Sequence, residues 1–125
     1  MTTGIVHDDM FLLHDTGLYH PERKERLIAV GEGLRTYGHH DHLVHFKPRR
    51  ATEEELRLIH PASYIRTIQQ TSGKPRTQLD ADTIASAESY EVALHAVGSL
   101  LVLIDAVEAG EIQNGFGFVR PPGHH

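Results

Sequence analysis

The chain contains no cysteine among its 125 residues. Disulfide bonds and thiolate metal sites are therefore excluded, and any metal ion would have to bind histidine, carboxylate or water ligands. An excess of positive charge is also missing, since the formal net charge is −5 and the one basic cluster, residues 47–50, is followed closely by three glutamates. Because phosphate binding needs clustered lysine and arginine, we expect a solvated loop there and no nucleic-acid partner.

Long apolar runs are absent as well. The longest strongly apolar run, residues 100–104, is far shorter than the roughly 18 residues of a membrane span. The first nine residues carry acidic side chains where a secretory signal needs a basic start and a long apolar stretch. We therefore expect no membrane partner, a cytoplasmic location and, without visible repeats or linkers, one modest domain.

Short strand patterns alternate with helical patterns along the chain. The strand patterns cover residues 3–6, 43–46 and 116–119. The helical patterns run from 21 to 38, from 52 to 60, from 61 to 73 and from 86 to about 107. Thr52 and Glu55 have the spacing of a capping box, and the long apolar helix after residue 86 is expected to be largely buried. The alternation predicts an α/β domain with parallel strands.

The last strand pattern is followed by the hexapeptide Arg-Pro-Pro-Gly-His-His, residues 120–125. In open α/β sheets, ligand sites gather beyond the carboxyl ends of the strands, so we expect a site to begin here. Adjacent side chains on extended backbone point to opposite sides, which disfavours chelation of one ion by His124 and His125 together. An acid/base role fits the pair better, because histidine titrates near neutral pH.

This hexapeptide resembles the tandem-histidine motif of the histone deacetylase superfamily, in the form found in bacterial amidohydrolases and class II deacetylases. Three upstream features fall in the order that the family shows. Residues 20–27 resemble its early helix-start motif, residues 60–65 its histidine–tyrosine segment, and residues 80–83 with the helix from Ser86 its central loop and helix. Lys24 stands where the family often has proline, which loosens the first helical turn and alters no chemistry.

The resemblance implies an arginase–deacetylase architecture, a parallel sheet flanked by helices, that is incomplete in this chain. Residues 1–125 are then expected to be the N-terminal portion of one deacetylase domain, truncated after the tandem histidines. The implied reaction is zinc-dependent removal of an acetyl group from acetyl-lysine, an acetylpolyamine or a related acetyl amide. The family's zinc ligands, an Asp-x-His pair and a later aspartate, would lie beyond residue 125, so we expect no metal ligand in this chain.

The resemblance also assigns roles to individual residues. His125 matches the general base that later acts as acid, and His124 matches the partner that tunes the site by hydrogen bonding. Arg26 matches an arginine that lines an internal cavity behind the metal, where its planar fork suits acetate, and the alternative is a surface arginine. Asp82 matches a rim aspartate that accepts hydrogen bonds from substrate, although Asp80 is close enough to take that position and a plain turn aspartate also fits.

Two other functions stay open at this point. One is a non-catalytic deacetylase-like domain that only binds ligands or partners. The other is a metal-binding module that uses the histidine-rich stretch between His39 and His45, although nothing there fixes a ligand geometry and a solvated loop fits better. Elsewhere, His14 and His20 flank an early polar loop that could reach the site, and His95 is expected to be a satisfied core histidine.

Overall fold

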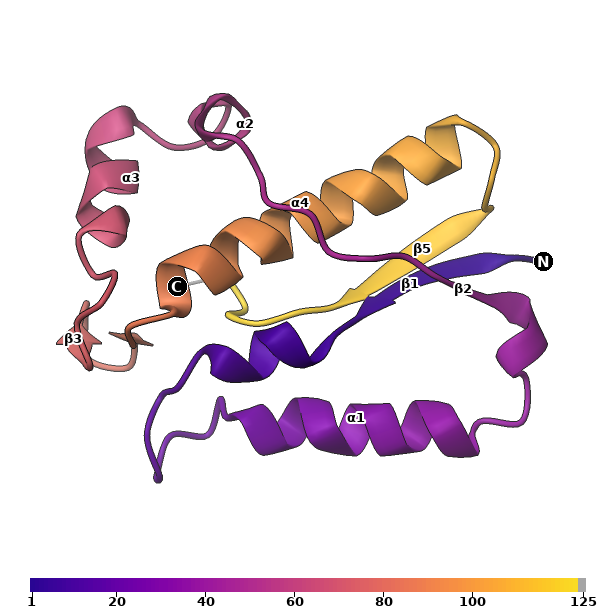
Figure 1. Cartoon of the computed structure of the whole chain (residues 1–125), viewed down its shortest axis with the longest axis horizontal. Coiled ribbons are helices and arrows are strands. Elements are labelled where there is room, and N and C mark those ends of the chain that lie inside the picture. The colour runs from indigo at the N-terminus through magenta and orange to yellow at the C-terminus, as the bar shows by residue number, and fades with distance from the viewer. Residues whose placement is uncertain (124–125) are drawn as a thin grey trace.

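The computed structural model of the chain describes residues 1–123, except for the side chain of His40. Strands and helices alternate along it (Figure 1). In chain order they are β1 (Thr3–His7), the 3₁₀ helix η1 (Asp9–Leu13), α1 (Lys24–Thr36), the 3₁₀ helix η2 (His40–His42), β2 (Leu43–His45), α2 (Glu53–Arg57), α3 (Ala62–Gln69), β3 (Thr77–Gln78), β4 (Ile84–Ala85), α4 (Ser89–Glu108) and β5 (Asn114–Phe118).

The main sheet has the strand order β2-β1-β5, and both pairings are parallel. Thr3 stands opposite Leu43 on one side and opposite Asn114 on the other, so β1 is the central strand. Parallel neighbours need crossover connections, which α1 supplies between β1 and β2 and which α4 completes before β5. In Figure 1 the sheet runs between α4 above and α1 below. The prediction of an α/β domain with parallel strands is confirmed.

The core joins both helices to the central strand and to η1. Val6 of β1 and Phe11 of η1 are completely buried, and they belong to one cluster with Leu27 of α1 and Leu103 of α4. Burying side chains of this size contributes roughly 1.5–3 kcal/mol each. The loop that follows η1 therefore starts from a firmly packed position.

The expectation that α4 is largely buried is wrong for one of its faces. Leu103 is 4% exposed, whereas Leu100 and Ile104 are 46% and 55% exposed. The sheet covers one side of the helix, and in the described residues 1–123 no second layer covers the other side. By length and composition α4 could cross a membrane, but its inner face packs on β1 and β5, as expected for a central helix of an α/β domain.

Gly110 ends α4 as the sequence indicates. Its φ angle is +74°, a conformation that L side chains rarely adopt. The Glu111 N–H donates to the Ala106 carbonyl at 2.9 Å, and the Gly110 N–H donates to the Val107 carbonyl at 3.0 Å. These two bonds form a Schellman motif, which satisfies carbonyl groups at the helix end and turns the chain toward β5.

Gly98 lets a neighbouring segment cross α4 at very short range. The Ala51 N–H donates to the carbonyl of Leu94 in the helix at 3.1 Å. A Cβ atom on Gly98 would lie only 1.9 Å from the carbonyl oxygen of Arg49, which is backbone and cannot rotate away. The segment after β2 is therefore held against α4 by a contact that only glycine permits.

The capping box is present, and the basic cluster next to it is paired with acids. Thr52 Oγ1 accepts from the Glu55 N–H at 3.2 Å, and the Thr52 N–H donates to Glu55 Oε2 at 2.8 Å. Arg49 and Arg50 form ion pairs with Glu55 at 2.8 Å and Glu91 at 2.9 Å. These pairs agree with a solvated, charge-balanced loop.

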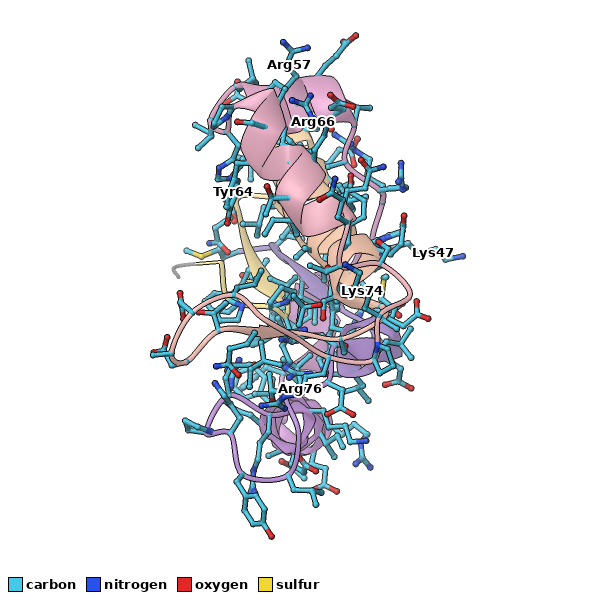
Figure 2. The ribbon with its side chains drawn as sticks, turned by 90° about the vertical axis from the view of Figure 1, so that its left-hand side faces the viewer. Lys47, Arg57, Tyr64, Arg66, Lys74 and Arg76 are labelled. Atoms are coloured by element: carbon cyan, nitrogen blue, oxygen red, sulfur yellow. The ribbon has the colours of Figure 1, made fainter. Side chains whose placement is uncertain are left out.

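Other basic side chains are spread along one end of the molecule in Figure 2. Arg57 and Arg66 lie near each other over α2 and α3, whereas Lys47, Lys74 and Arg76 lie lower in the view, on other segments. This distribution is not the continuous basic stripe that tracks a phosphate backbone. The absence of a nucleic-acid partner stays a prediction.

Candidate functional site

The chain forms an open cleft beyond the carboxyl ends of β1 and β5. Because the strands are parallel, the loop after η1 and the segment after β5 leave the sheet at the same edge. The cleft has a volume of about 780 Å³. Its lining comes from residues 16–22, Arg26, Arg76, residues 81, 82 and 84, and Pro122. Segments that are far apart in the sequence thus meet where the α/β topology predicts a site.

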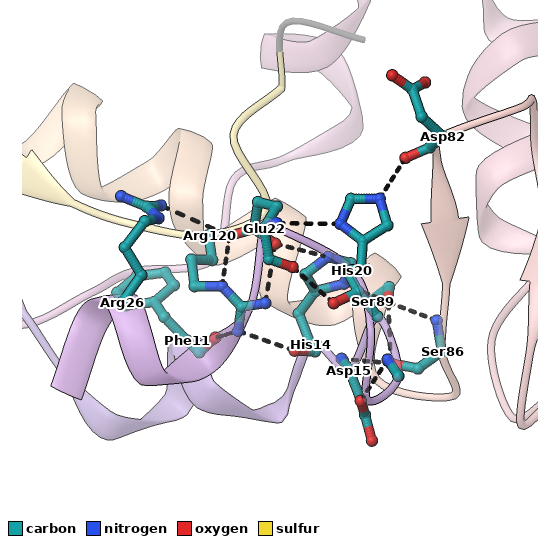
Figure 3. Close-up of polar contacts among 12 residues, drawn as sticks. Phe11, His14, Asp15, His20, Glu22, Arg26, Asp82, Ser86, Ser89 and Arg120 are labelled. Carbon is teal, nitrogen blue, oxygen red and sulfur yellow. Dashed lines mark hydrogen bonds and ion pairs between the residues drawn. The ribbon is translucent and has the colours of Figure 1, made fainter. Parts of the chain in front are cut away.

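Below the cleft, Arg120 and Glu22 form a bidentate ion pair (Figure 3). Arg120 Nε lies 2.6 Å from Glu22 Oε1, and Arg120 Nη2 lies 2.8 Å from Glu22 Oε2. The planar guanidinium fork matches the two carboxylate oxygens, which gives geometric specificity as well as attraction. The pair fixes the loop before α1 to the segment that follows β5.

The Arg120 side chain is fully buried, with 0% exposure, and each of its nitrogen atoms has a partner. Its Nη1 donates to the carbonyl oxygens of Phe11 at 3.1 Å and His14 at 2.8 Å. A buried charge without a counter-charge would cost several kcal/mol, so Arg120 and Glu22 depend on each other. One side chain of the segment after β5 therefore holds both η1 and the loop between η1 and α1.

The pKa of Glu22 lies below its usual value of 4.5. Burial alone would raise this pKa, but the hydrogen bonds from Arg120 and its positive charge outweigh burial. Glu22 is consequently a carboxylate at neutral pH. With both of its oxygens bound to Arg120, it is not a proton carrier for a reaction in the cleft.

His14 lies beside this ion pair and is 4% exposed. Its Nδ1 is 2.7 Å from Ser89 Oγ, and its Nε2 is 3.7 Å from Glu22 Oε2. Burial, followed by the positive charge of Arg120, lowers the pKa of His14 below 6.5, although Glu22 opposes the shift. The ring is therefore neutral at physiological pH and ties η1 to the start of α4.

The ion pair also explains where α1 begins. The sequence predicts a helix from Pro21, but the first helical residue is Lys24 and Arg23 has extended backbone angles. Glu22 lies before the helix because its carboxylate reaches back to the buried Arg120. The tertiary contact with Arg120 and the local bond from the Glu22 N–H to His20 Nδ1 thus hold Glu22 outside the predicted first turn.

His20 joins the two sides of the cleft. Its Nδ1 accepts from the Glu22 N–H at 3.0 Å, and its Nε2 lies 2.6 Å from the carbonyl oxygen of Asp82. From the sequence, His14 and His20 were expected to flank an early polar loop that could reach the site. The structure places it in the lining of the cleft, with both ring nitrogens engaged.

The structure distinguishes the positions of Asp80 and Asp82. Asp82 lines the cleft, whereas Asp80 Oδ1 accepts from the Asp82 N–H at 3.0 Å and so caps its own turn. Hydrogen bonds from the Thr83 side chain and the Asp82 backbone hold the pKa of Asp80 below 3.8. The role of Asp82 at the rim stays a prediction, and its position is compatible with that role.

Arg26 lines the same cleft from α1. Its Nη2 lies 3.5 Å from Glu22 Oε1, and its side chain is 51% exposed. Among residues 1–123 it stands in an open wall rather than in an enclosed cavity. The predicted acetate contact of Arg26 remains untested by this arrangement.

The tandem histidines, His124 and His125, lie outside the described residues. The ion pair of Arg120 and Glu22 was missed by sequence reasoning, because each residue was noted only as part of a motif. One signal could have indicated the pair: an acidic and a basic residue, Glu22 and Arg120, lie in two separate segments that both resemble motifs of one family. The Nδ1 of His95 donates to the Glu91 carbonyl at 2.8 Å inside α4, so the ring is satisfied as predicted, but it is half-buried and not a core residue.

The histidine-rich stretch does not form a metal cluster in the described part of the chain. The rings of His39 and His42 lie 6.2 Å apart between centroids, and His45 lines a different pocket next to α1. Across residues 1–123, with the His40 side chain excepted, no group of three or more His, Asp or Glu side chains is arranged to hold an ion. In the cleft itself, His20 and Glu22 already use their ligand atoms. The described residues therefore do not fit a zinc site.

Known proteins resemble the chain in both sequence and structure. A probable deacetylase of Archaeoglobus fulgidus is 35% identical over all of this chain and 35% of its own length. The human polyamine deacetylase HDAC10 is 38% identical over 99% of this chain and 20% of its own length. The crystal structure of the HDA15 HD domain superimposes with a TM-score of 0.91 at 32% identity, covering 100% of this chain and 37% of that one.

The chain matches only part of each relative. The chain spans about a fifth to a third of the length of these curated relatives. The family model described as the histone deacetylase domain matches residues 20–125, which include the tandem histidines and the cleft lining from His20 onward. The parallel sheet flanked by helices agrees with the solved domain over the whole chain. The chain therefore belongs to the histone deacetylase family.

Proposed function

We propose that this chain supplies the N-terminal part of a zinc-dependent deacetylase that hydrolyses an acetyl amide. The observation that carries the proposal is the shared cleft of Arg26, Asp82 and Pro122 beyond the carboxyl ends of β1 and β5. The first two are the positions at which the family resemblance expects product and substrate contacts. Pro122 lies only two residues before His124 in the sequence, which supports a common site.

In this proposal the tandem histidines move the proton. His125 takes a proton from the attacking water and later gives it to the leaving amine, while His124 tunes the site by hydrogen bonding. Histidine suits both steps because its intrinsic pKa lies near the working pH. Arg120 and Glu22 support this role, since their ion pair fixes the segment that leads to the histidines.

The zinc ion is a separate part of the proposal, because the described residues do not fit it. When bound, zinc would polarise the acetyl carbonyl of the substrate as a Lewis acid. Its ligands are proposed to follow residue 125 in a longer protein, as the family resemblance implies. The role of the present residues is to bind the substrate, orient it and manage its protons.

The proposed substrates are acetyl-lysine, as the family resemblance implies, and acetylpolyamines, which agree with the name of the human polyamine deacetylase. At the cleft, the carboxylate of Asp82 could accept an N–H from a peptide backbone or bind the ammonium group of a polyamine. Leu18 and Tyr19 line the same cleft and are 84% and 96% exposed. They offer apolar contact to the methylene chain that both substrate classes share.

The test uses a protein that contains this chain together with the proposed zinc ligands. Acetate release would be measured from an acetyl-lysine peptide and from an N-acetylated polyamine, with and without a chelator. Chelator-sensitive release supports the proposal, whereas binding of both substrates without turnover supports a non-catalytic binding domain. The 125-residue chain by itself is expected to show no zinc-dependent turnover, and robust turnover by it would place a metal site within these residues.

Asp82→Ala is expected to weaken substrate binding in that protein by about 1.5–3 kcal/mol, the range for a hydrogen bond to a charged group. This loss should appear as an increase in KM, with the free energy of unfolding little changed. Asp80→Ala is the matched control, because Asp80 caps the same turn without lining the cleft. A loss for Asp80→Ala with unchanged kinetics for Asp82→Ala would transfer the rim role to Asp80.

A further inference from the structure

The ring of His20 connects a buried and an exposed part of the site, as Figure 3 shows. Its Nδ1 accepts from the Glu22 N–H at 3.0 Å. A ring nitrogen that accepts carries no hydrogen, so in the neutral ring the hydrogen is on Nε2. Nε2 then donates to the carbonyl oxygen of Asp82, at 2.6 Å and across 62 residues of sequence.

The Glu22 end of this bridge is rigid. Glu22 is bound through both carboxylate oxygens to Arg120, whose side chain is completely buried. Arg120 in turn holds the carbonyl groups of Phe11 and His14. The imidazole is therefore attached to the best-anchored point of the cleft.

The Asp82 end is an exposed turn that is organised mainly by its own short-range bonds. The Leu79 N–H donates to the Thr83 carbonyl at 2.8 Å, and the Gln78 side chain donates to the Asp80 carbonyl at 2.6 Å. These bonds shape the turn. At its base, the Asp15 N–H donates to Ser86 Oγ at 3.0 Å, which connects the residue after β4 to the loop before α1. At its tip, the His20 bond to the Asp82 carbonyl supplies a second long-range connection.

We propose that His20 is a positioning residue, which holds Asp82 at a fixed place across the cleft from the segment anchored by Arg120. The inference rests on the proposed function, since it concerns the placement of the rim carboxylate relative to the tandem histidines. His20 acts through the backbone of Asp82 and does not itself handle the proton. Loss of His20 should therefore weaken the binding of substrates that contact Asp82, with little effect on the rate of the chemical step.

Three variants separate the two bonds of the ring. His20→Ala removes both bonds. His20→Asn keeps an acceptor near the position of Nδ1 for the Glu22 N–H, but its side chain is too short to reach the Asp82 carbonyl. His20→Gln places an amide N–H near the position of Nε2, so it keeps the donor to Asp82. Gln is therefore expected to restore function, and Asn is not.

The kinetic arm uses a protein with this chain and the proposed zinc ligands. We expect His20→Ala to raise KM roughly three- to tenfold, the range for loss of one hydrogen bond, with kcat within about twofold. Combined with Asp82→Ala, it should raise KM no further, because residues that act through one another are not additive. A fall in kcat at constant KM, or independent additive effects of the two substitutions, would overturn the proposal.

The second arm needs no activity and uses the 125-residue chain. Nitrogen-15 shifts of the His20 ring should show hydrogen on Nε2 and an accepting Nδ1. In His20→Ala and His20→Asn the amide signals of residues 79–83 should shift and their order parameters fall, and His20→Gln should restore them. Unchanged signals in His20→Ala would overturn the positioning role, whatever the assay shows. If the bridge is present but no acetyl amide is hydrolysed, the proposed function fails and the bridge stands.

Discussion

Arg120 and Glu22 are 98 residues apart in the sequence, yet they form a bidentate ion pair of 2.6 and 2.8 Å at the base of the cleft. The Arg120 side chain is 0% exposed and that of Glu22 is 16% exposed. The pair joins the segment after β5 to the loop before α1, so the two sides of the site cannot shift independently. It is the main support that the structure adds to the sequence motif.

Glu22→Gln should lower the free energy of unfolding by roughly 3–5 kcal/mol, because it leaves a buried guanidinium without its counter-charge. Urea unfolding followed by circular dichroism measures the change. Glu25→Gln is the matched control, since Glu25 forms only an exposed contact of 3.9 Å with Arg23. Equal small losses for the two variants would mean that Arg120 is accessible to water in solution.

Gly98→Ala and Gly33→Ala should change stability in opposite directions. A Cβ at Gly98 meets the Arg49 carbonyl at 1.9 Å, so the crossing segment must move and unfolding should become easier by at least about 1–3 kcal/mol. Gly33 lies in α1 with no heavy atom within 4 Å of an added Cβ. Alanine there should stabilise the helix by about 0.5–1 kcal/mol, which thermal unfolding of both variants checks.

The local features of the fold could be predicted because short-range chemistry determines them. The capping box of Thr52 and Glu55, the helix end at Gly110 and the parallel α/β arrangement each follow from residue types at fixed spacing. The start of α1 could not, because Arg120 draws Glu22 away from the helix. The exposed face of α4 could not either, since an apolar sequence shows which residues favour burial and not how many layers cover them.

The site could be predicted only in part. The family resemblance identified Arg26 and Asp82, and the structure brings both to one cleft without testing their roles. The bonds of His20 could not be read from the sequence, because one partner is a backbone carbonyl 62 residues away. Every residue has a backbone carbonyl group, so residue types do not indicate which carbonyl a side chain will bind.

The burial of His14 predicts that stability falls in mild acid. Its folded pKa lies below 6.5, so as the pH drops the unfolded chain binds a proton before the folded chain does. Stability from this residue is complete well above pH 6.5 and is lost as the pH falls through 6.5 toward the folded pKa. Urea unfolding between pH 8 and pH 5 should show a flatter profile for His14→Asn than for the unsubstituted chain.

The control for His14 is His42→Asn, because His42 is exposed on η2. This variant should keep the pH dependence of the unsubstituted chain. A profile that flattens equally in both variants would assign the effect to the histidines as a group rather than to the buried ring beside Glu22.

The tandem histidines provide the most direct test of the chemistry, in a protein that carries this chain and the proposed zinc ligands. His125→Ala should lower kcat by roughly 10²–10⁴-fold, the usual contribution of a positioned acid/base, because no neighbouring group can both take and return the proton. His124→Ala should cost less and shift one limb of the pH profile, since that ring tunes the site without carrying the proton to product. Zinc content should stay near stoichiometric in both variants, and kcat/KM against pH beside metal analysis measures each effect. Loss of zinc from either variant would make that histidine a ligand, and equal small rate losses in both would remove the acid/base assignment.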